Sequence, residues 1–375
     1  MRRDDATTVV VGGGPAGAAA ARTLAHAGCD VLVLATRAGP ARPPVESLVP
    51  AGRILLEELG CWDAFVSGGH LPSYGNSSAW GGTTARDTDF IRSPYGQGWH
   101  LDRDRFESAL LRAAGEAGAK VRTSGKLLSL ERERSRWRLA VGSRGRTDDL
   151  RCRWLVDCTG RSRRVARSLG VARRYDDRLV ALYARARPSS STREDRDGRT
   201  LVEAIPEGWF HTALLPSGER AIGFFTDVGS PWLGRARSSA GFMRLVESTV
   251  QVSAKLEAYG YALVAEPRST DARSSRLERF HGDRWVAAGD AATTFDPLSS
   301  QGIFSALYSG LKAGTALAEL LGGDRDALRG YGAALESVYD QYLVNRLAYY
   351  AQERRWPSSA FWGARSPNAV SGAPA

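Results

Sequence analysis

The feature that most constrains this chain is a pair of glycine-containing segments that lie almost the whole sequence apart. Residues 9–28 read VVVGGGPAGAAAARTLAHAG, which places Gly12, Gly14 and Gly17 at the G-x-G-x-x-G spacing. Residues 285–302 read WVAAGDAATTFDPLSSQG, which predicts a strand, a Gly-Asp turn and a loop that enters another helix. The G-x-G-x-x-G spacing by itself occurs in both NAD-binding and FAD-binding proteins. The two segments together therefore restrict the choice of cofactor more than either segment alone.

The first segment predicts a strand, a turn and a helix that together hold a pyrophosphate. Val9, Val10 and Val11 form an apolar run suited to a parallel strand that is buried on both faces. The glycines allow a tight turn, a close approach of the backbone to the pyrophosphate, and close packing of helix on strand. The alanine-rich helix expected over residues 15–27 offers free N-terminal N–H groups to the phosphates, and a strand over residues 31–34 completes the unit.

One expected part of this unit is missing. The end of the second strand normally carries an Asp or Glu for the ribose hydroxyls, but this chain has Ala35, Thr36 and Arg37 there. Either Thr36 or backbone groups take that role, or the adenosine half is held less tightly. Arg37 would suit the 2′-phosphate of NADP, but that alternative leaves the Gly289-Asp290 pair unexplained.

A third glycine element lies at residues 153–170, RWLVDCTGRSRRVARSLG. It predicts a buried strand, a turn at Asp157-Cys-Thr-Gly160 and an arginine-rich helix. A turn of this kind brings the chain back against the nucleotide. An ordinary strand-to-helix connection is the alternative, and the presence of the other two elements weakens it.

Length and composition set broad bounds. The chain of 375 residues has the size of one large or two ordinary domains, and 43% hydrophobic with 25% charged residues is typical of a globular protein. No apolar stretch approaches the ~20 residues of a membrane span, and MRRDDATT leads directly into the first strand, so we expect no signal peptide. The four cysteines lack metal-binding spacing, which predicts reduced thiols, no metal site and a cytoplasmic location.

The net charge of +10 comes almost entirely from arginine residues that are scattered along the chain. No basic tail and no alternation of aromatic and basic residues is present, so nucleic-acid binding is not predicted. A basic surface would still attract an acidic peptide, a phosphorylated carrier or free FAD.

The pattern of strands and helices divides the chain into interleaved parts. Residues 5–70, 100–175 and 275–330 are predicted to form a discontinuous nucleotide-binding domain. Residues 71–99 and 176–274 are predicted to form the substrate domain, and residues 331–375 a C-terminal helical segment and tail.

Within the predicted substrate domain, three stretches have strand character, as in a mostly antiparallel sheet. They are residues 179–186, 201–215 and 221–226. The polar connection over residues 188–198 is expected to be a mobile loop. The stretch from residue 324 to about 355 is expected to be helical.

The three glycine elements resemble the glutathione-reductase-type FAD fold of flavin monooxygenases, tryptophan halogenases and geranylgeranyl-reductase-like proteins. The resemblance implies an α/β fold in which a Rossmann-like FAD-binding domain carries an inserted, mostly antiparallel β-sheet. It implies that Gly289-Asp290 meets the ribityl and phosphate region of FAD and that the loop from Pro297 to Gly302 lies near the isoalloxazine ring. Arg103, in HLDRDRF, resembles an arginine that contacts the flavin, and Arg53 is a weaker candidate.

The predicted FAD-binding residues come from these elements and their flanks. They are Gly12, Gly14, Pro15, Ala16, Gly17, Thr36, Arg37, Arg53, Arg103, Gly160, Gly289, Asp290, Pro297, Gly302 and Ile303.

A narrower resemblance extends over nearly the whole chain, to the LodB-like flavoproteins. It is carried by VESLVPAGRILLEELG, GNSSAWGG, TDFIRSPYGQGWHLDR, EGWFHTALLP, FDPLSSQGI and AYYAQERRWPSSAFW. Proteins of this family are similar to tryptophan halogenases and help to mature quinone-cofactor oxidases by oxygenating a tryptophan side chain. The chain departs from the family at Val45, where glycine is usual before Glu46-Ser47, and at Ala35.

Halogenation is the alternative that the same resemblance raises. Halogenases of this type use a lysine shortly after the Glu46-like segment to position and polarise hypohalous acid. This chain has no lysine before Lys120, and Gly208-Trp209-Phe210 only partly resembles the halogenase tryptophan-rich motif. Halogenation is therefore disfavoured.

The remaining chemistry is oxygenation of an electron-rich ring such as indole or phenol, in which reduced FAD and oxygen supply an electrophilic oxygen and the protein orients the ring and excludes water. The catalytic candidates are Glu46, as a base, together with His100, His211 and Trp209. Trp80, Trp99 and Phe210 are further pocket candidates. A structural role remains open for each histidine, and sheet packing for Trp209 and Phe210, because aromatic residues favour strands.

The sequence thus predicts an FAD-dependent monooxygenase that acts on an aromatic ring, in first place a tryptophan of a peptide or partner oxidase. No second G-x-G-x-x-G unit is visible, so electrons come either from NAD(P)H directly or from a partner flavin reductase. A small-molecule oxygenase, a geranylgeranyl-reductase-like enzyme and a flavin-binding maturation chaperone are the alternatives.

Overall fold

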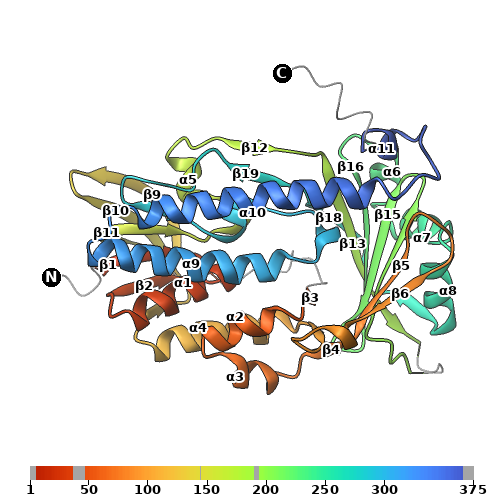
Figure 1. Cartoon of the computed structure of the whole chain (residues 1–375), viewed down its shortest axis with the longest axis horizontal. Helices are drawn as coiled ribbons and strands as arrows, with labels where there is room; N and C mark the ends of the chain where they lie inside the picture. Colours follow the sequence, from red (N-terminus) through yellow and green to blue (C-terminus); the bar gives the residue numbers. More distant parts are fainter. Residues whose placement is uncertain (1–5, 37–46, 144, 190–193, 366–375) are drawn as a thin grey trace.

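The computed structural model describes residues 6–36, 47–143, 145–189 and 194–365. Figure 1 shows a sheet with helices packed beside it at one end of the molecule and a large, strongly twisted sheet at the other. The long helix α10 (Ala327–Tyr350) runs from the first part to the second.

The first sheet has the strand order β20-β21-β11-β1-β2-β8. Its parallel core pairs β21, β11, β1, β2 and β8, and Val9 and Val10 are fully buried in it, as the apolar run predicted. An antiparallel meander of β9 and β10 extends from β11. The strands are β1 (Ala6–Val11), β2 (Val31–Leu34), β8 (Lys120–Arg122), β9 (Lys126–Glu133), β10 (Arg136–Ser143), β11 (Arg146–Asp157), β20 (His281–Gly282) and β21 (Trp285–Ala287).

The helices beside this sheet pack at very short range. Helix α1 (Pro15–His26) lies against α9 (Gly302–Gly322) because α9 has no side chain at the crossing: a Cβ on Gly310 would lie 2.2 Å from the carbonyl oxygen of Ala16. On its other side α1 contacts α4 (Arg103–Glu116), and α10 packs on α9. The shorter helices of this part are α2 (Gly52–Glu58), α3 (Trp62–Val66) and α5 (Arg164–Ser168).

The second large sheet has the order β17-β13-β16-β15-β14-β5-β6, with β18 also paired to β13. All pairs are antiparallel except β14 with β5. The predicted stretch 201–215 is two strands, because the chain turns at Pro206-Glu207. The strands are β5 (Gly75–Ala79), β6 (Arg86–Asp89), β13 (Leu179–Pro188), β14 (Thr200–Ile205), β15 (Gly208–Leu214), β16 (Arg220–Asp227), β17 (Tyr261–Leu263) and β18 (Arg268–Asp271).

The two faces of this sheet have different partners. Phe210 and Phe224 point to one face, where they pack with Phe242 of the covering helices. Trp209 and Phe225 point to the other face, toward the nucleotide-binding part and the C-terminal aromatic residues. The covering helices are α6 (Pro231–Arg235), α7 (Ser239–Val246) and α8 (Gln251–Ala258).

Small sheets and short helices connect the two parts. Within the predicted stretch 71–99, β5 and β6 join the large sheet, whereas β4 and β7 pair in a separate sheet with β3. The elements are β3 (Ser47–Leu48), β4 (Leu71–Ser73), β7 (Gly98–His100), β12 (Arg173–Tyr175), β19 (Ser275–Leu277), β22 (Thr293–Thr294), α11 (Ala360–Gly363) and the 3-10 turns η1 (Phe90–Arg92), η2 (Gly160–Ser162), η3 (Gly289–Ala291) and η4 (Pro297–Ser299).

The described end of the predicted mobile loop 188–198 is anchored rather than free. Asp195 and Arg220 form a fully buried ion pair at 2.6 Å, and Tyr261 also donates to the Asp195 carboxylate. Lys255 pairs with Asp197 at 2.7 Å. The polar composition predicted a mobile loop. Composition alone does not show that Asp195 and Asp197 pair with basic side chains elsewhere in the chain.

No helix in the described ranges is long and apolar enough to cross a membrane. Cys29, Cys61, Cys152 and Cys158 are free thiols, as predicted. The described residues contain no group of three or more His, Cys, Asp or Glu side chains that could hold a metal ion.

The crossing of α1 and α9 should tolerate no side chain at Gly310. We expect Gly310→Ala to lower the free energy of unfolding by about 1–3 kcal/mol, the usual cost of overpacking, measured by urea denaturation. Gly322→Ala, near the end of the same helix, places its Cβ in open space. It should change stability by less than about 1 kcal/mol, and equal effects of the two variants would contradict the packing argument.

Candidate functional site

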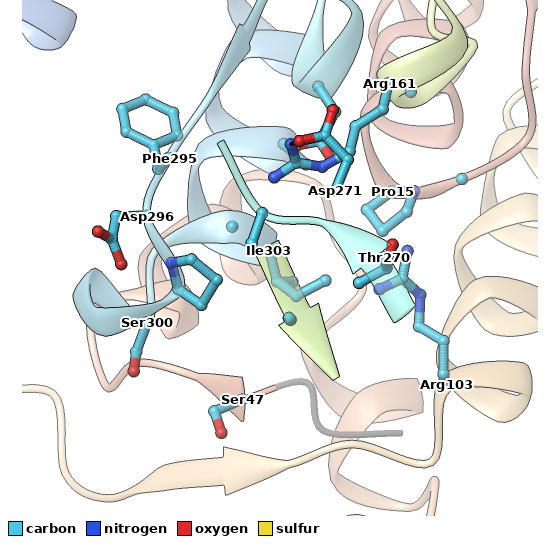
Figure 2. Close-up of a pocket in the computed structure, with 18 of the residues that line it drawn as sticks. Pro15, Ser47, Arg103, Arg161, Thr270, Asp271, Phe295, Asp296, Ser300 and Ile303 are labelled. Atoms are coloured by element: carbon cyan, nitrogen blue, oxygen red, sulfur yellow. Dashed lines mark ion pairs between the residues drawn. The ribbon is translucent and has the colours of Figure 1, made fainter. Parts of the chain in front are cut away.

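A cavity of about 360 Å³ lies between the N-terminus of α1 and the inner face of the large sheet (Figure 2). Its first wall comes from the three glycine elements and their flanks: Gly14, Pro15, Ala16, Cys158, Gly160, Arg161, Ala288, Asp290, Phe295, Asp296, Pro297, Ser300, Gly302, Ile303 and Ala306. Its second wall comes from the sheet: Ala181, Tyr183, His211, Gly223, Phe225, Thr270, Asp271 and Ala272. Ser47 and Arg103 lie at a further edge.

The N-terminus of α1 opens directly into this cavity. Gly14 is the N-cap, no side chain caps the helix, and the first turn contains no acidic residue. A Cβ on Gly14 would have Glu107 Oε1, at 3.6 Å, as its nearest neighbour, so the space beside the backbone is open. The first N–H groups and the positive end of the helix dipole therefore face the cavity, an arrangement that suits a phosphate group.

Three of the predicted glycines lie outside the cavity lining and allow close backbone packing behind it. Gly12 has φ +110°, and a Cβ there would lie 2.1 Å from the carbonyl oxygen of Cys158. A Cβ on Gly17 would lie 1.9 Å from the oxygen of Gly12, and one on Gly289 would lie 2.7 Å from Ala16 Cβ. Their lack of side chains lets the three glycine elements meet at the start of α1.

The Asp157–Gly160 turn is held by a buried carboxylate. Asp157 is fully buried and accepts hydrogen bonds from the N–H groups of Thr159 and Ala166 and from the Thr159 hydroxyl. Burial raises its pKa, and these hydrogen bonds oppose that rise. The turn thereby presents Gly160 and Arg161 to the cavity.

Arg161 was not among the residues predicted from the sequence. Its guanidinium lies 3.8 Å from Asp271 and 3.7 Å from Asp290, and Figure 2 shows it beside Asp271. Arg173 donates to the Asp290 carbonyl oxygen. Charges of both signs thus lie close together where the Gly-Asp turn meets the large sheet. The position of Arg161 directly after Gly160 is the sequence feature from which its place in the cavity could have been predicted.

The loop from Pro297 to Gly302 is fixed by a second buried carboxylate, Asp296. Asp296 caps η4 through the N–H of Leu298, pairs with Arg346 at 3.2 Å, and accepts a hydrogen bond of 2.8 Å from the Tyr350 hydroxyl. Burial raises its pKa, and the Arg346 charge opposes that rise. Both partners come from α10, so this helix positions the loop.

Trp209 belongs to the same network and not to the cavity wall. Its indole N–H donates to the Tyr350 hydroxyl at 3.1 Å, and its ring stacks on Phe225 at 3.8 Å between centroids. Trp209 is 1% exposed. A hydrogen-bonded chain therefore runs from Trp209 of the large sheet through Tyr350 to Asp296. The Trp209 ring also packs against the Phe225 ring, which lines the cavity.

The two candidate histidines occupy different positions. His100 is buried behind the cavity, where its Nε2 donates to the Gly198 carbonyl oxygen at 2.9 Å and its Nδ1 lies 3.0 Å from Ser47 Oγ. Burial lowers its pKa to about 4. His211 lines the cavity, and in the described ranges its buried Nε2 has no hydrogen-bond partner. Burial lowers its pKa to about 3, and His100 adds to that shift.

Several predicted residues lie elsewhere. Arg53 pairs with Glu57 at 2.7 Å and lies over the ring of Trp62, away from the cavity lining. Thr36 is exposed and forms an isolated bridge with Ser124. Glu46 and Arg37 fall outside the described residues.

Arg103 does line the cavity, where it pairs with Glu107 at 2.8 Å. The other aromatic pocket candidates do not: Trp99 packs on Trp62, Trp80 on Trp209, and Phe210 on the opposite face of the sheet.

These residues fit FAD. The open N-terminus of α1 suits its pyrophosphate, and the glycine contacts leave the backbone exposed at the cradle. The Pro297 loop and the start of α9 form an adjoining part of the cavity wall. Fold and site together define a flavin-dependent oxidoreductase, and the chain belongs to the FAD binding domain family, whose sequence profile matches residues 5–343.

Individual relatives refine this placement. The chain is 29% identical to the LodB protein of Marinomonas mediterranea, named as an FAD-dependent oxidoreductase, over 78% of each chain. It matches the structure of the myxobacterial chondrochloren halogenase CndH with a TM-score of 0.85 and 26% identity, over 97% of this chain and 86% of that one. It matches the peptidyl tryptophan dihydroxylase QhpG with a TM-score of 0.77 and 24% identity, over 96% and 78%.

The predicted cofactor, the FAD fold and the LodB-like resemblance are thereby confirmed. The protein is an FAD-dependent oxidoreductase. The assignment of individual site residues stays a prediction.

Removing the hydroxyl of Tyr350 should loosen the network around Asp296. We expect Tyr350→Phe to lower the free energy of unfolding of the FAD-loaded protein by about 1–3 kcal/mol, because the Trp209 N–H loses its acceptor and the buried carboxylate loses a donor. Tyr349→Phe, next to it and 59% exposed, is the control and should stay within about 0.5 kcal/mol of the parent. Equal stability of the two variants in urea would refute the role given to Tyr350.

The buried neutral His100 should make stability depend on pH. Its folded pKa of about 4 lies below the ordinary value of 6.5, so the unfolded chain binds the proton first. Its contribution is complete above pH 6.5 and is lost as the pH falls toward 4, by about 3 kcal/mol over that window.

The contribution of His100 is measured by urea unfolding at several pH values. His100→Gln should flatten the decline, whereas His26→Gln, which alters an exposed residue, should not. A decline of unchanged slope in His100→Gln would show that other groups cause it.

Proposed function

We propose that this protein oxygenates an aromatic ring with FAD, and that the ring is a tryptophan side chain of a peptide or partner protein. The observation that carries this proposal is the composition of the cavity. One wall consists of the elements that fit FAD. The facing wall is a sheet surface with Tyr183, Phe225 and His211, whose buried Nε2 has no hydrogen-bond partner within the described part of the chain. Similarity to LodB, and in fold to a peptidyl tryptophan dihydroxylase, supports this substrate class.

When bound and reduced, FAD supplies the chemistry with oxygen, and the residues of the chain hold the reactants in place. The N–H groups at the start of α1 bind the pyrophosphate, and Pro297 with Gly302 and Ile303 forms the wall near the ring system. Phe225, stacked on Trp209, gives the facing wall a rigid apolar surface that excludes water. His211, which its lowered pKa keeps neutral near pH 7, offers a ring nitrogen to a polar group of the substrate.

Halogenation is the competing reaction, because halogenases are among the similar proteins. The reaction attributed to such enzymes needs a lysine ammonium at the reaction site. No lysine is among the described residues that line this cavity. The first lysine of the chain, Lys120, pairs with Asp30 and is 62% exposed at its side chain. These observations favour oxygen transfer.

The reaction can be tested with a short peptide that contains a single tryptophan. The FAD-loaded protein is incubated with this peptide, NADH, a flavin reductase, ¹⁸O₂ and both chloride and bromide. We expect the peptide to gain ¹⁸O on its indole ring and no halogen, as read by mass spectrometry. A parallel reaction with NADPH and no reductase decides how the flavin is reduced.

Each other outcome would point to a different function. Incorporation of bromine or chlorine would establish halogenation. Loss of a substrate double bond without oxygen uptake, with an isoprenoid alcohol in place of the peptide, would establish a reductase. Maturation of a partner oxidase by protein whose FAD is replaced by a redox-inactive analogue would establish a chaperone role. Reduced FAD without protein is the control for uncatalysed oxidation.

A further inference from the structure

Three neighbouring strands of the large sheet place two polar rings on either side of a glycine. In the sheet register Tyr183 of β13 is opposite Gly223 of β16, and Gly223 is opposite His211 of β15. All three residues line the cavity. Because direct cross-strand partners point to the same face, the side chains of Tyr183 and His211 flank a strip of bare backbone.

The gap over this strip has the width of one aromatic ring. Two strand spacings separate Tyr183 from His211, which is roughly 9.6 Å. Offset-stacked rings keep their centroids about 4.5 Å or more apart, so a ring between two others requires roughly 9 Å. A side chain at the central position would fill this space, and Gly223 has none.

The ends of the gap are also defined. A Cβ added to Gly223 would lie 2.9 Å from Cε2 of Phe225, so the Phe225 ring closes the gap along the strand. This ring is held by its stacking on Trp209, which is tied in turn to Tyr350. The next row of the sheet has Ala181 opposite Phe225 and Thr270 opposite Ala181, so small side chains leave room beside the gap.

A polar group marks one side of the gap. The Nε2 atom of His211 is buried and has no hydrogen-bond partner among the described residues. A buried polar atom without a partner destabilises the folded protein, and a ligand that supplies the missing hydrogen bond removes that penalty. An indole N–H or a phenol O–H at the edge of an inserted ring is such a group.

We propose that the aromatic ring of the substrate inserts over Gly223 between Tyr183 and His211, and that its edge N–H or O–H donates to Nε2 of His211. This inference rests on the proposed function for the aromatic nature of the substrate. It makes Gly223 the residue that determines ring size and His211 a positioning residue that sets the orientation of the ring. Binding is independent of turnover, so the two proposals can fail separately.

The test measures binding of N-acetyltryptophan amide to the FAD-loaded, oxidised protein by isothermal titration calorimetry. We expect Gly223→Ala to weaken binding at least ~10-fold, because the new methyl group occupies the gap and displaces Phe225. Gly142→Ala, which changes a strand glycine of β10 outside the cavity lining, is the matched control and should bind like the parent. FAD content and unfolding temperature are measured for each variant.

A second pair of variants tests the hydrogen bond and does not depend on the fate of Gly223→Ala. His211→Gln keeps a polar atom near Nε2, and His211→Phe keeps only the ring. We expect His211→Phe to weaken binding of N-acetyltryptophan amide ~10-fold and His211→Gln to restore most of it. N-acetyl-1-methyltryptophan amide lacks the N–H, so its affinity should be nearly the same for the parent and for His211→Phe.

The outcomes separate the two proposals. Parent-like binding by both Gly223→Ala and His211→Phe, or no binding of the indole amide by the parent, would overturn the ring site even if the peptide is oxygenated. Weaker binding in these variants together with a parent that transfers no oxygen would support the ring site and refute the proposed reaction.

Discussion

The structure depends on one constraint, the close approach of three backbone segments to the start of α1. Gly12, Gly17, Gly289 and Gly310 each meet a neighbour at a distance that leaves no room for a Cβ. These contacts bring the Asp157–Gly160 turn, the Gly-Asp turn and α9 against one helix N-terminus. The open end of α1 then faces the cavity with its N–H groups unpaired, as an anion site requires. The candidate flavin site is thus shaped by backbone contacts that exclude a Cβ.

The second organising element is α10, which ties the flavin loop to the large sheet. Its Tyr350 and Arg346 hold the buried carboxylate of Asp296, and Tyr350 also accepts from Trp209. A buried charge needs such partners, because an isolated one is very costly. As a consequence, hydrogen bonds to α10 hold both walls of the cavity in place. Movement of either wall relative to α10 would break these hydrogen bonds.

Patterns local in the chain pointed to the elements that form the first wall of the cavity. Gly14, Pro297 and Gly302 line the cavity, as their motifs suggested, because a strand, a turn and a helix in sequence place their own residues. The sheet wall was not predicted beyond His211. Tyr183 and Gly223 carry no motif, and they become neighbours only through strand register. Aromatic composition likewise pointed to Trp209 and Phe210, but Trp209 is covered by Phe225 and Tyr350, and alternation along β15 turns Phe210 to the opposite face.

By itself, the sequence determined the class of protein: the glycine spacing and the Gly-Asp segment specify the dinucleotide fold, because only glycine permits those close contacts and positive φ values. The tertiary structure alone decided which polar side chains face the reaction space. His100 and His211 are both histidines on strands. Both ring nitrogens of His100 have hydrogen-bond partners behind the cavity wall, whereas His211 lines the wall with a buried Nε2 that finds no partner among the residues the structure describes. That difference arises from cross-strand pairing between residues far apart in the chain, which no local pattern encodes.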